Sequence, residues 1–238
     1  MRKSSGNATS LCEAKMYVPA HFKMPADKAR EFVNSRLAGD LVTTGPDGLE
    51  ATFLPFSVTW HDESCTLKAH LSKVNKQWSH EGQALVIFNG PDLYIPPRWT
   101  PQSGSEQDLL RRPQVVPTWN YITVHMRGEL LAHEDPEWIK QSLFELSQQH
   151  DPSWDFSSIS SHKLAKMTRA LVGVEIRVSE VIGKAKMSQN RSASDILNLA
   201  DAIAQAGHGE ETQKYLREVS LPHAKAREQA VLDAKDKR

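Results

Sequence analysis

The sequence has too few cysteines to be cross-linked or to bind metal through sulfur. Only Cys12 and Cys65 occur among its 238 residues, so neither a disulfide framework nor a four-cysteine zinc site can form. Long apolar runs are also missing, because the longest, Ala84 to Phe88, is far shorter than the roughly 20 residues that span a bilayer. No apolar stretch follows Arg2 and Lys3, so no export signal is recognised. These absences predict a cytoplasmic protein with reduced thiols and no membrane contact.

An excess of charge of either sign is absent as well. Lys plus Arg and Asp plus Glu both total 29, so the formal net charge is zero and the pI is about 7.2. This balance argues against a protein that binds nucleic acid mainly by releasing counterions. With 39% apolar and 24% charged residues, the composition is that of a folded chain long enough to bury a sizeable core.

Familiar catalytic and metal-binding motifs are not found. The sequence contains no GxGxxG, P-loop, GxSxG or HExxH pattern. His125 and His133 lie eight residues apart with no carboxylate at ligand spacing, so we interpret them as ordinary strand histidines and predict no metal site.

Short segments of alternating polarity dominate the chain up to about residue 133. Strands are predicted at 41–44, 50–60, 65–70, 84–89, 118–127, 129–133, 174–178 and 181–187. Helices are predicted at 27–37, 136–150 and 161–171, at 210–219 and 223–235, and from Ser194 to Ile203. Because long helices do not separate most successive strands, the fold is expected to be mainly β with peripheral helices (α+β), an antiparallel sheet closing into a barrel.

The chain is expected to have three parts. Residues 1–15 are small and polar and predict a disordered tail, residues 16–191 predict the barrel domain, and residues 192–238 predict a helical C-terminal extension. Five of the thirteen prolines fall in residues 96–117, around a Ser-Gly-Ser sequence. A loop of this length inside a domain is usually functional or disordered, so we interpret it as a mobile cover over a site.

Polar residues gather where three of the predicted strands end. After the strand at 65–70, Ser72, Lys73 and Asn75 offer a hydroxyl, an ammonium group and an amide, which together suit a phosphate. The other interpretation of this stretch is a solvated surface loop.

Two further strand ends combine aromatic, amide and basic groups. Trp119 and Asn120 lie between the long loop and a buried strand, where they could stack on and bond to a planar heterocycle. Residues 183–191 run from a strand into polar donors and Arg191. Taken alone, these are equally typical of a core tryptophan and a helix start. Taken with the first stretch, they favour a planar phosphorylated ligand such as FMN.

Several short motifs carry a more specific signal. They are Met16–Phe22 (MYVPAHF), Ala51–Phe56 (ATFLPF), His70–Trp78 (HLSKVNKQW), Phe88–Pro91 with Tyr94–Ile95, Val116–Tyr121 (VPTWNY) with Val124, His125 and Gly128, and Lys186–Arg191 (KMSQNR). With these motifs, in this order, residues 16–191 resemble the FMN-binding negative transcriptional regulators of the PaiB type, a branch of the flavin-binding split barrels. The chain departs from that family at Lys76, usually a proline, and at Ser72 and Val74, where the family has arginine or alanine. It also departs at Pro96 and Thr100, which replace a serine and a tyrosine.

The resemblance implies a six-stranded, mainly antiparallel split β-barrel and a homodimer with FMN at the subunit interface. The residues that it implies for the phosphate are Ser72 and Lys73, with His70 and Asn75 beside them. Those that it implies along the isoalloxazine edge are Thr52, Phe53, Leu54 and Pro55. It implies that Trp119 and Asn120, from the other subunit, cover the ring or bond its polar edge, and that Gln189 and Arg191 close the phosphate end.

Two functions of different classes remain open at this point. One is the flavin-binding transcriptional regulator that the resemblance implies, and the other is an FMN-dependent oxidoreductase acting on a small molecule. A weaker alternative is a haem-binding or haem-degrading barrel with His125 or His133 as the axial ligand. The sequence shows no defensible helix-turn-helix, so direct DNA binding is left open.

Overall fold

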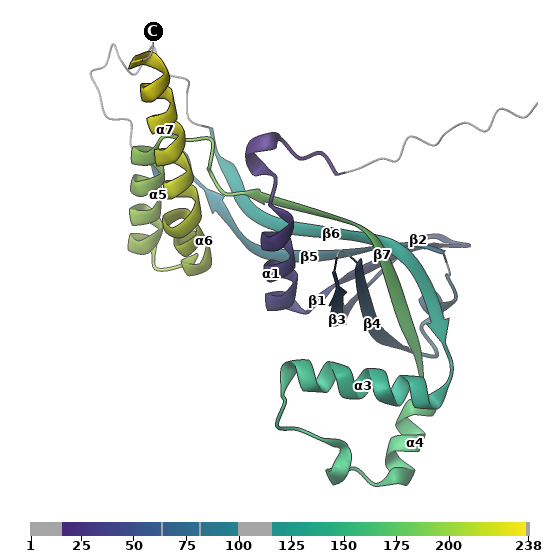
Figure 1. Ribbon diagram of the computed structural model, residues 1–238. Helices are drawn as coiled ribbons and strands as arrows, with labels where there is room; N and C mark the ends of the chain where they lie inside the picture. Colours follow the sequence, from purple (N-terminus) through teal and green to yellow (C-terminus); the bar gives the residue numbers. More distant parts are fainter. Residues whose placement is uncertain (1–15, 63, 81, 100–115, 237–238) are drawn as a thin grey trace, which may run out of the picture.

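Seven antiparallel strands form one sheet in a computed structural model, which describes residues 16–62, 64–80, 82–99 and 116–236 (Figure 1). The order across the sheet is β2-β1-β5-β6-β7-β4-β3. The strands are β1 (Ala38–Gly45), β2 (Gly48–Pro55), β3 (Ser57–His61), β4 (Ser64–Ser72), β5 (Gly82–Ile95), β6 (Thr118–His133) and β7 (Leu171–Lys186). The two outermost strands, β2 and β3, are consecutive in the chain and separated only by Phe56. The sheet therefore curls round on itself into an open barrel.

Alternation of apolar and polar side chains decides which face of each strand lines the barrel. Along β4, the buried residues Cys65, Leu67, Ala69 and Leu71 alternate with more exposed neighbours, as the two-residue period of a strand requires. They pack against the fully buried side chains of Leu41, Phe56, Val86, Phe88, Val124, Met126 and Ile176. Since side chains fill this interior, ligand-binding groups must lie on the rim or the outer face of the barrel.

The long strands β5, β6 and β7 set the length of the molecule (Figure 1). Residues 121–133 of β6 pair with residues 173–186 of β7, and the register shifts between Arg127 and Gly128. A Cβ on Gly128 would lie 2.2 Å from the carbonyl oxygen of Arg177. Only glycine allows this close approach of two backbones at the irregularity.

Helices are distributed along the barrel and at its two ends (Figure 1). Ala29 and Val33 of α1 (Ala26–Arg36) are buried against the barrel, and α1 begins after Pro25. At one end, α3 (Pro136–His150) and α4 (Ser161–Arg169) lie next to β4 and β7, and the Trp138 ring covers Gly173. The short 3-10 helices are η1 (Ala20–Phe22), η2 (Lys76–Ser79), η3 (Pro97–Trp99) and η4 (Phe156–Ser158).

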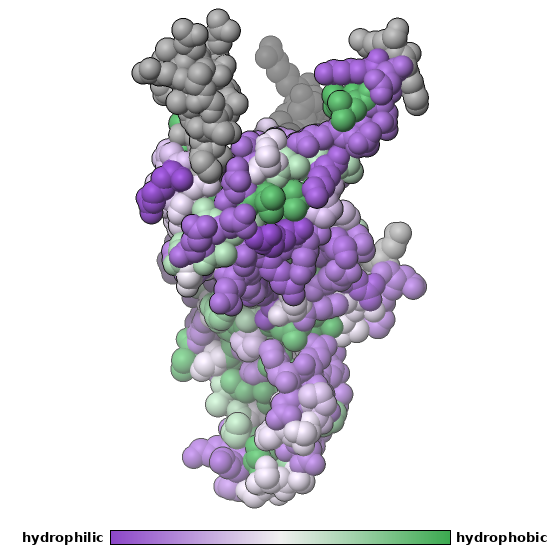
Figure 2. Space-filling view, turned by 90° about the vertical axis from the view of Figure 1, so that its left-hand side faces the viewer, coloured by the Kyte–Doolittle hydropathy of each residue, from purple (hydrophilic) through white to green (hydrophobic). Residues whose placement is uncertain are grey.

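The C-terminal helices lie at the opposite end of the long strands (Figure 1). They are α5 (Ala193–Ala206), α6 (Glu210–Tyr215), a π-helical turn η5 (Leu216–Ser220) and α7 (Leu221–Asp236). They have their own apolar core, which Leu93 and Ile95 join to β5 and which consists of Ile95, Ile196, Leu199, Ala200, Ile203, Leu216 and Ala224. Viewed from this side, the upper part of the surface is mostly hydrophilic, and hydrophobic side chains are more frequent in the lower part (Figure 2).

The predicted architecture is confirmed, with corrections in detail. The barrel has seven strands rather than six, because the predicted strand 50–60 is divided at Phe56 into β2 and β3. The predicted strands 174–178 and 181–187 are one strand, β7. The division of the chain at residues 191 and 192 stays a prediction. The predicted tail, 1–15, and most of the predicted cover, 96–117, lie outside the described residues. No helix in the described part of the chain is both long and apolar enough to cross a bilayer.

Candidate functional site

The predicted site residues fall into two groups at opposite ends of the barrel. We call Thr52, His70, Ser72, Lys73 and Asn75 the loop cluster, because most of them lie in or beside the loop after β4. We call Trp119, Asn120, Gln189 and Arg191 the strand-end cluster, because they lie at the start of β6 and just after β7.

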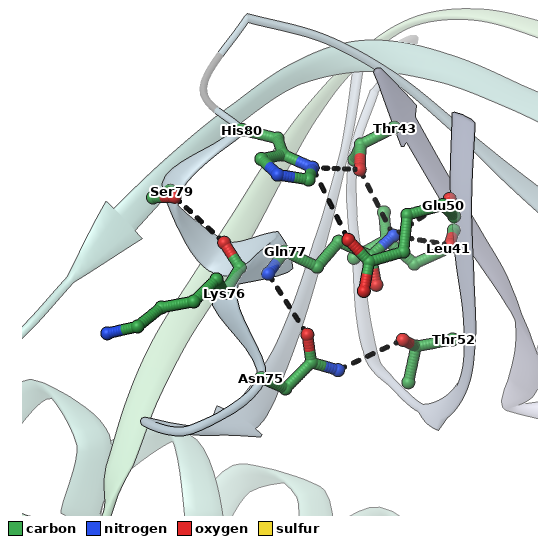
Figure 3. Close-up of polar contacts among 9 residues, drawn as sticks. All are labelled: Leu41, Thr43, Glu50, Thr52, Asn75, Lys76, Gln77, Ser79 and His80. Carbon is green, nitrogen blue, oxygen red and sulfur yellow. Dashed lines mark hydrogen bonds and ion pairs between the residues drawn. The ribbon is translucent and has the colours of Figure 1, made fainter. Parts of the chain in front are cut away.

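The loop cluster is organised by Asn75. The backbone N–H of Asn75 donates to the Ser72 carbonyl at 2.9 Å and closes a tight turn. Its side-chain Nδ2 donates to Thr52 Oγ1 on β2 at 3.1 Å, and its Oδ1 accepts from the backbone N–H of Gln77 at 3.0 Å (Figure 3). The backbone N–H of Lys73 donates to the Ala170 carbonyl at 2.9 Å. The structure thus brings Thr52 and Asn75 into contact and fixes the turn that presents Ser72 and Lys73.

Gln77 is the residue that sequence reasoning missed in this cluster. It is completely buried, and its Nε2 lies within hydrogen-bond distance of three oxygens on β1 and β2 (Figure 3). These are the Leu41 carbonyl at 2.9 Å, Thr43 Oγ1 at 3.1 Å and the Glu50 carbonyl at 3.1 Å. Gln77 therefore ties the loop after β4 to the β1–β2 hairpin. The one signal for it was its place in the HLSKVNKQW motif.

His80 also contacts the β1–β2 hairpin to which Gln77 is bonded (Figure 3). Its Nδ1 lies 3.1 Å from Thr43 Oγ1 and 3.8 Å from Glu50 Oε2. A Cβ on Gly45 would lie 2.2 Å from the His80 ring, so glycine leaves the space that the ring occupies. The polar contacts of residues 43, 50, 77 and 80 are therefore structural, and they hold the loop cluster in place.

Two groups of the loop cluster remain available for a ligand. Lys73 Nζ forms an ion pair with Glu134 Oε2 at 3.3 Å, and both side chains are well exposed to solvent. His70 Nδ1 is buried and has no hydrogen-bond partner among the described residues. Burial lowers the pKa of His70, so its ring is neutral at pH 7. The cluster thus offers a displaceable ammonium group and an unsatisfied imidazole.

Successive side chains of the predicted stretch Thr52–Pro55 on β2 point to opposite faces of the sheet. The Leu54 side chain is buried in the barrel core, so only its backbone is available to a ligand. Phe53 points outward and is 67% exposed. Leu49 on the same strand and Val74 in the neighbouring loop are also exposed, at 79% and 84%. Exposed apolar side chains therefore occur both on β2 and in the loop after β4.

Asn120 is the centre of the strand-end cluster. It is 1% exposed, and its Oδ1 accepts from Ser188 Oγ at 3.1 Å. Its Nδ2 has no hydrogen-bond partner among the described residues. Gln189 is also buried, with its side chain bonded to the backbone: Oε1 accepts from Met187 N at 2.8 Å, and Nε2 donates to the Ala185 carbonyl at 2.7 Å. Gln189 shapes the turn, whereas Asn120 keeps a free donor.

The aromatic part of the strand-end cluster is open to solvent. Trp119 is half exposed and packs edge-on against Tyr94, with ring centroids 6.1 Å apart. Lys186 Nζ donates to the Trp119 carbonyl at 2.7 Å and lies 5.8 Å from the Tyr121 ring centroid. Burial lowers the pKa of the Lys186 ammonium group, which donates to the Trp119 carbonyl. An exposed indole beside a cationic group suits a planar anionic ligand.

The two clusters lie at different levels along the long strands. His70 lies opposite Gly173 on β7, which lies opposite His133 at the end of β6. Thr52 is level with Met126, through Leu41 on β1 and Val86 on β5. Asn120 is near the start of β6. At about 3.3 Å per residue, roughly 40 Å of strand separates Asn120 from the level of His70, and roughly 20 Å separates it from the level of Thr52.

The histidines considered for haem have different surroundings. His133 stacks on Trp138 with centroids 4.0 Å apart, and its Nε2 lies 3.5 Å from Glu175 Oε2. The pKa of His125 is lowered by burial and by the cations Arg127 and Lys184. Within the described ranges, no group of three His, Cys, Asp or Glu residues could hold a metal ion.

The chain is similar to known proteins in sequence. Residues 16–180 match a family model described as "Putative FMN-binding domain". The "Protease synthase and sporulation protein PAI 2" of Bacillus subtilis (strain 168) is 29% identical over 197 residues, which cover 79% of this chain and 89% of that protein. Gln189 and Arg191 lie beyond the residues that the family model matches.

Solved structures show the same fold at low sequence identity. The conserved hypothetical protein Rv2991 from Mycobacterium tuberculosis superposes with a TM-score of 0.50 at 16% identity, covering 74% of this chain and 94% of that one. The flavocytochrome Anf3 from Azotobacter vinelandii also gives 0.50, at 12% identity, covering 68% and 67%. These similarities support the split-barrel architecture.

Proposed function

Because the chain belongs to the family of FMN-binding domains that its residues 16–180 match, we propose that two copies of it hold FMN between them and act as a flavin-dependent regulator of gene expression. In this assembly, the loop cluster of one copy and the strand-end cluster of the other form each site. Bound FMN supplies an isoalloxazine ring that can accept and return electrons.

This proposal rests on the division of the candidate ligand groups between the loop cluster and the strand-end cluster. The buried polar atoms without a hydrogen-bond partner among the described residues include His70 Nδ1 in the loop cluster and Asn120 Nδ2 in the strand-end cluster. Leaving such an atom unsatisfied costs about 1–3 kcal/mol. A ligand with polar groups at both ends would relieve both costs at once, which makes these two positions suitable for FMN.

Exposed apolar side chains supply the reason for a second copy. Leu49 and Phe53 on β2 and Val74 in the loop after β4 are each more than 60% exposed. Large apolar side chains gathered on a surface usually mark a contact site. A partner subunit seated here would cover them and bring its own Trp119 and Asn120 to the ligand.

Each group then has a defined task. Ser72 and Lys73 bind the phosphate, since a hydroxyl and an ammonium group are suited to its oxygens. The backbone of β2 from Thr52 onward lies along the ring edge, with Trp119 of the other copy against the ring face.

The regulatory role is taken from the family resemblance and from the relative named for protease synthesis and sporulation. The balanced charge of the chain leaves direct DNA binding open. An FMN-dependent oxidoreductase remains the alternative. Anaerobic bleaching of bound flavin by NADH or NADPH would favour that alternative, whereas retardation of a promoter fragment would favour the regulator.

Subunit complementation tests the shared site directly. Lys73→Ala damages one half-site and Asn120→Ala damages the other, so each mutant homodimer should bind FMN about tenfold or more weakly. A heterodimer of the two variants, isolated with two different tags, contains one site with both changes and one site with neither. It should therefore bind one FMN per dimer with the affinity of the wild type.

The alternatives give different results. If each site lies within one chain, the heterodimer has two damaged sites and no wild-type affinity, which would overturn the shared site. A wild-type protein that binds no FMN would overturn the function itself. Melting temperatures of both homodimers control for folding, because Asn120 is buried.

A further inference from the structure

We propose that Arg227 and Ser220, in the C-terminal helices, are positioning residues that hold the turn 187–191 in the shape needed to close the phosphate end of the FMN site. This inference rests on the proposed function, because that turn carries Gln189 and Arg191. It assigns a task to helices that follow residue 180, where the match to the family model ends.

The turn after β7 has a backbone that needs support. Ser188 has a φ of 63°, in the left-handed region that non-glycine residues adopt rarely. It is buried, and its carbonyl accepts from the backbone N–H of Arg191 at 3.0 Å. A conformation of this kind costs about 1–3 kcal/mol and persists only where the surroundings impose it.

The C-terminal helices provide that support through the backbone carbonyls of the turn. Arg227 Nη1 donates to the Gln189 carbonyl and Nη2 to the Arg191 carbonyl, each at 2.5 Å. Ser220 Oγ donates to the Met187 carbonyl at 2.7 Å. The C-terminal helices thus donate to three carbonyls of the turn, on both sides of Ser188 in the sequence.

The side chains of Arg227 and Ser220 are suited to fixing the backbone carbonyls of the turn. A guanidinium presents several N–H groups in a rigid plane, so Arg227 can fix the spacing of two carbonyls, which a single ammonium group cannot do. Ser220 is the last residue of the π-helical turn η5 and is completely buried. Such turns are rare and often occur at functional sites, because the extra residue re-aims side chains.

Other contacts tie the same helices to the same place. Glu228 Oε1 accepts from the backbone N–H of Ala193 at 2.8 Å, which fixes the start of α5 relative to α7. Tyr215 is partly buried, and its side chain lies close enough to Gln189 for this amide to oppose the rise in the Tyr215 pKa that burial causes. Because these contacts converge on residues 187–193, they hold the turn in place before any ligand arrives, and less ordering is left for binding.

Hydrogen exchange and flavin affinity test this role together. In Arg227→Gln, amide exchange at residues 188–192 of the ligand-free protein should be at least about tenfold faster than in the wild type. Affinity for FMN should fall by about five- to twentyfold, while affinity for riboflavin, which lacks the phosphate, should change less than twofold. Lys225→Gln is the matched control, since it removes the same charge from an exposed position two residues earlier.

Ser220→Ala provides a milder second variant, in case Arg227→Gln fails to fold. It removes one hydroxyl and should give smaller changes in the same direction. Unchanged exchange at 188–192 in both variants would overturn the proposal, as would faster exchange with an unchanged ratio of FMN to riboflavin affinity. If the wild type binds no flavin, the proposed function fails and this role in the site fails with it, whereas the exchange data still show whether Arg227 holds the turn.

Discussion

Neutralising Glu134 should strengthen FMN binding, because this carboxylate competes with the phosphate for Lys73. Lys73 Nζ lies 3.3 Å from Glu134 Oε2, and the two side chains are 43% and 60% exposed. When a phosphate binds the Lys73 ammonium group, the ion pair with Glu134 breaks, and the Glu134 carboxylate is left beside the negatively charged phosphate. Glu134→Gln removes the competing charge and keeps the size of the side chain.

The magnitude follows from two effects. An exposed ion pair contributes about 0.2–1 kcal/mol, so freeing Lys73 gains no more than that. A carboxylate about 7 Å from a phosphate of nearly two charges is repelled by about 1 kcal/mol in water, before screening. Glu134→Gln should therefore tighten FMN binding by roughly three- to tenfold at low salt. Lys73→Ala, in contrast, should remove about 1.5–3 kcal/mol, or roughly ten- to one-hundredfold in affinity.

Flavin fluorescence quenching can measure both variants against FMN and riboflavin. Riboflavin has no phosphate and should respond to neither change, so the ratio of the two affinities is the informative quantity. Glu137→Gln, an equal charge change on the first turn of α3, is the matched control. If Lys73→Ala leaves the ratio within twofold of the wild type, Lys73 does not bind the phosphate. If Glu134→Gln weakens FMN binding, Glu134 does not compete with the phosphate for Lys73.

Three further predictions concern the frame of the site. Gln77→Ala should lower the free energy of unfolding by about 2–4 kcal/mol in urea denaturation, since it removes the buried hydrogen bonds that join the loop after β4 to β1 and β2; Ser79→Ala is the exposed control. Because burial lowers the pKa of His70, the unfolded chain takes up a proton near pH 6.5 before the folded chain does. The melting temperature should therefore fall as the pH drops below 6.5, and His70→Gln should flatten that fall. Burial raises the pKa of Cys65 to about 12, so this thiol should react with alkylating reagents only after unfolding, as mass spectrometry would show.

Local patterns in the sequence predicted several elements closely. The helix expected at 136–150 is α3, because Asp135 accepts from the first backbone N–H groups and Pro136 suits the first turn. The corner at Phe56 was not predictable from alternation. Leu54, Phe56 and Val58 are all buried, so the two-residue period runs unbroken through the point where the chain leaves β2 for β3.

The contacts that hold the candidate site together could not be predicted from the sequence. The motif around residues 70–78 predicts a phosphate-binding loop, yet Gln77 bonds to carbonyls on two strands far away in the sequence, and no local pattern encodes such partners. Arg227 is a similar case, because it follows the turn that it holds by 36 residues in the chain. In both cases the acceptors are backbone oxygens, which every residue carries.

The loop cluster and the strand-end cluster are held by separate parts of the chain, and this bears on how flavin binding and assembly would be coupled in the proposed dimer. Gln77 fixes the loop cluster to the β1–β2 hairpin, and Arg227 fixes the turn 187–191 to α7. Neither arrangement depends on the other, so each half is ordered during folding, and the cost of ordering does not fall on ligand binding. If FMN bridges two copies, whatever favours association must favour FMN binding by the same free energy, and the reverse holds too. A regulator built in this way would report flavin through its state of assembly, without any large rearrangement of the barrel.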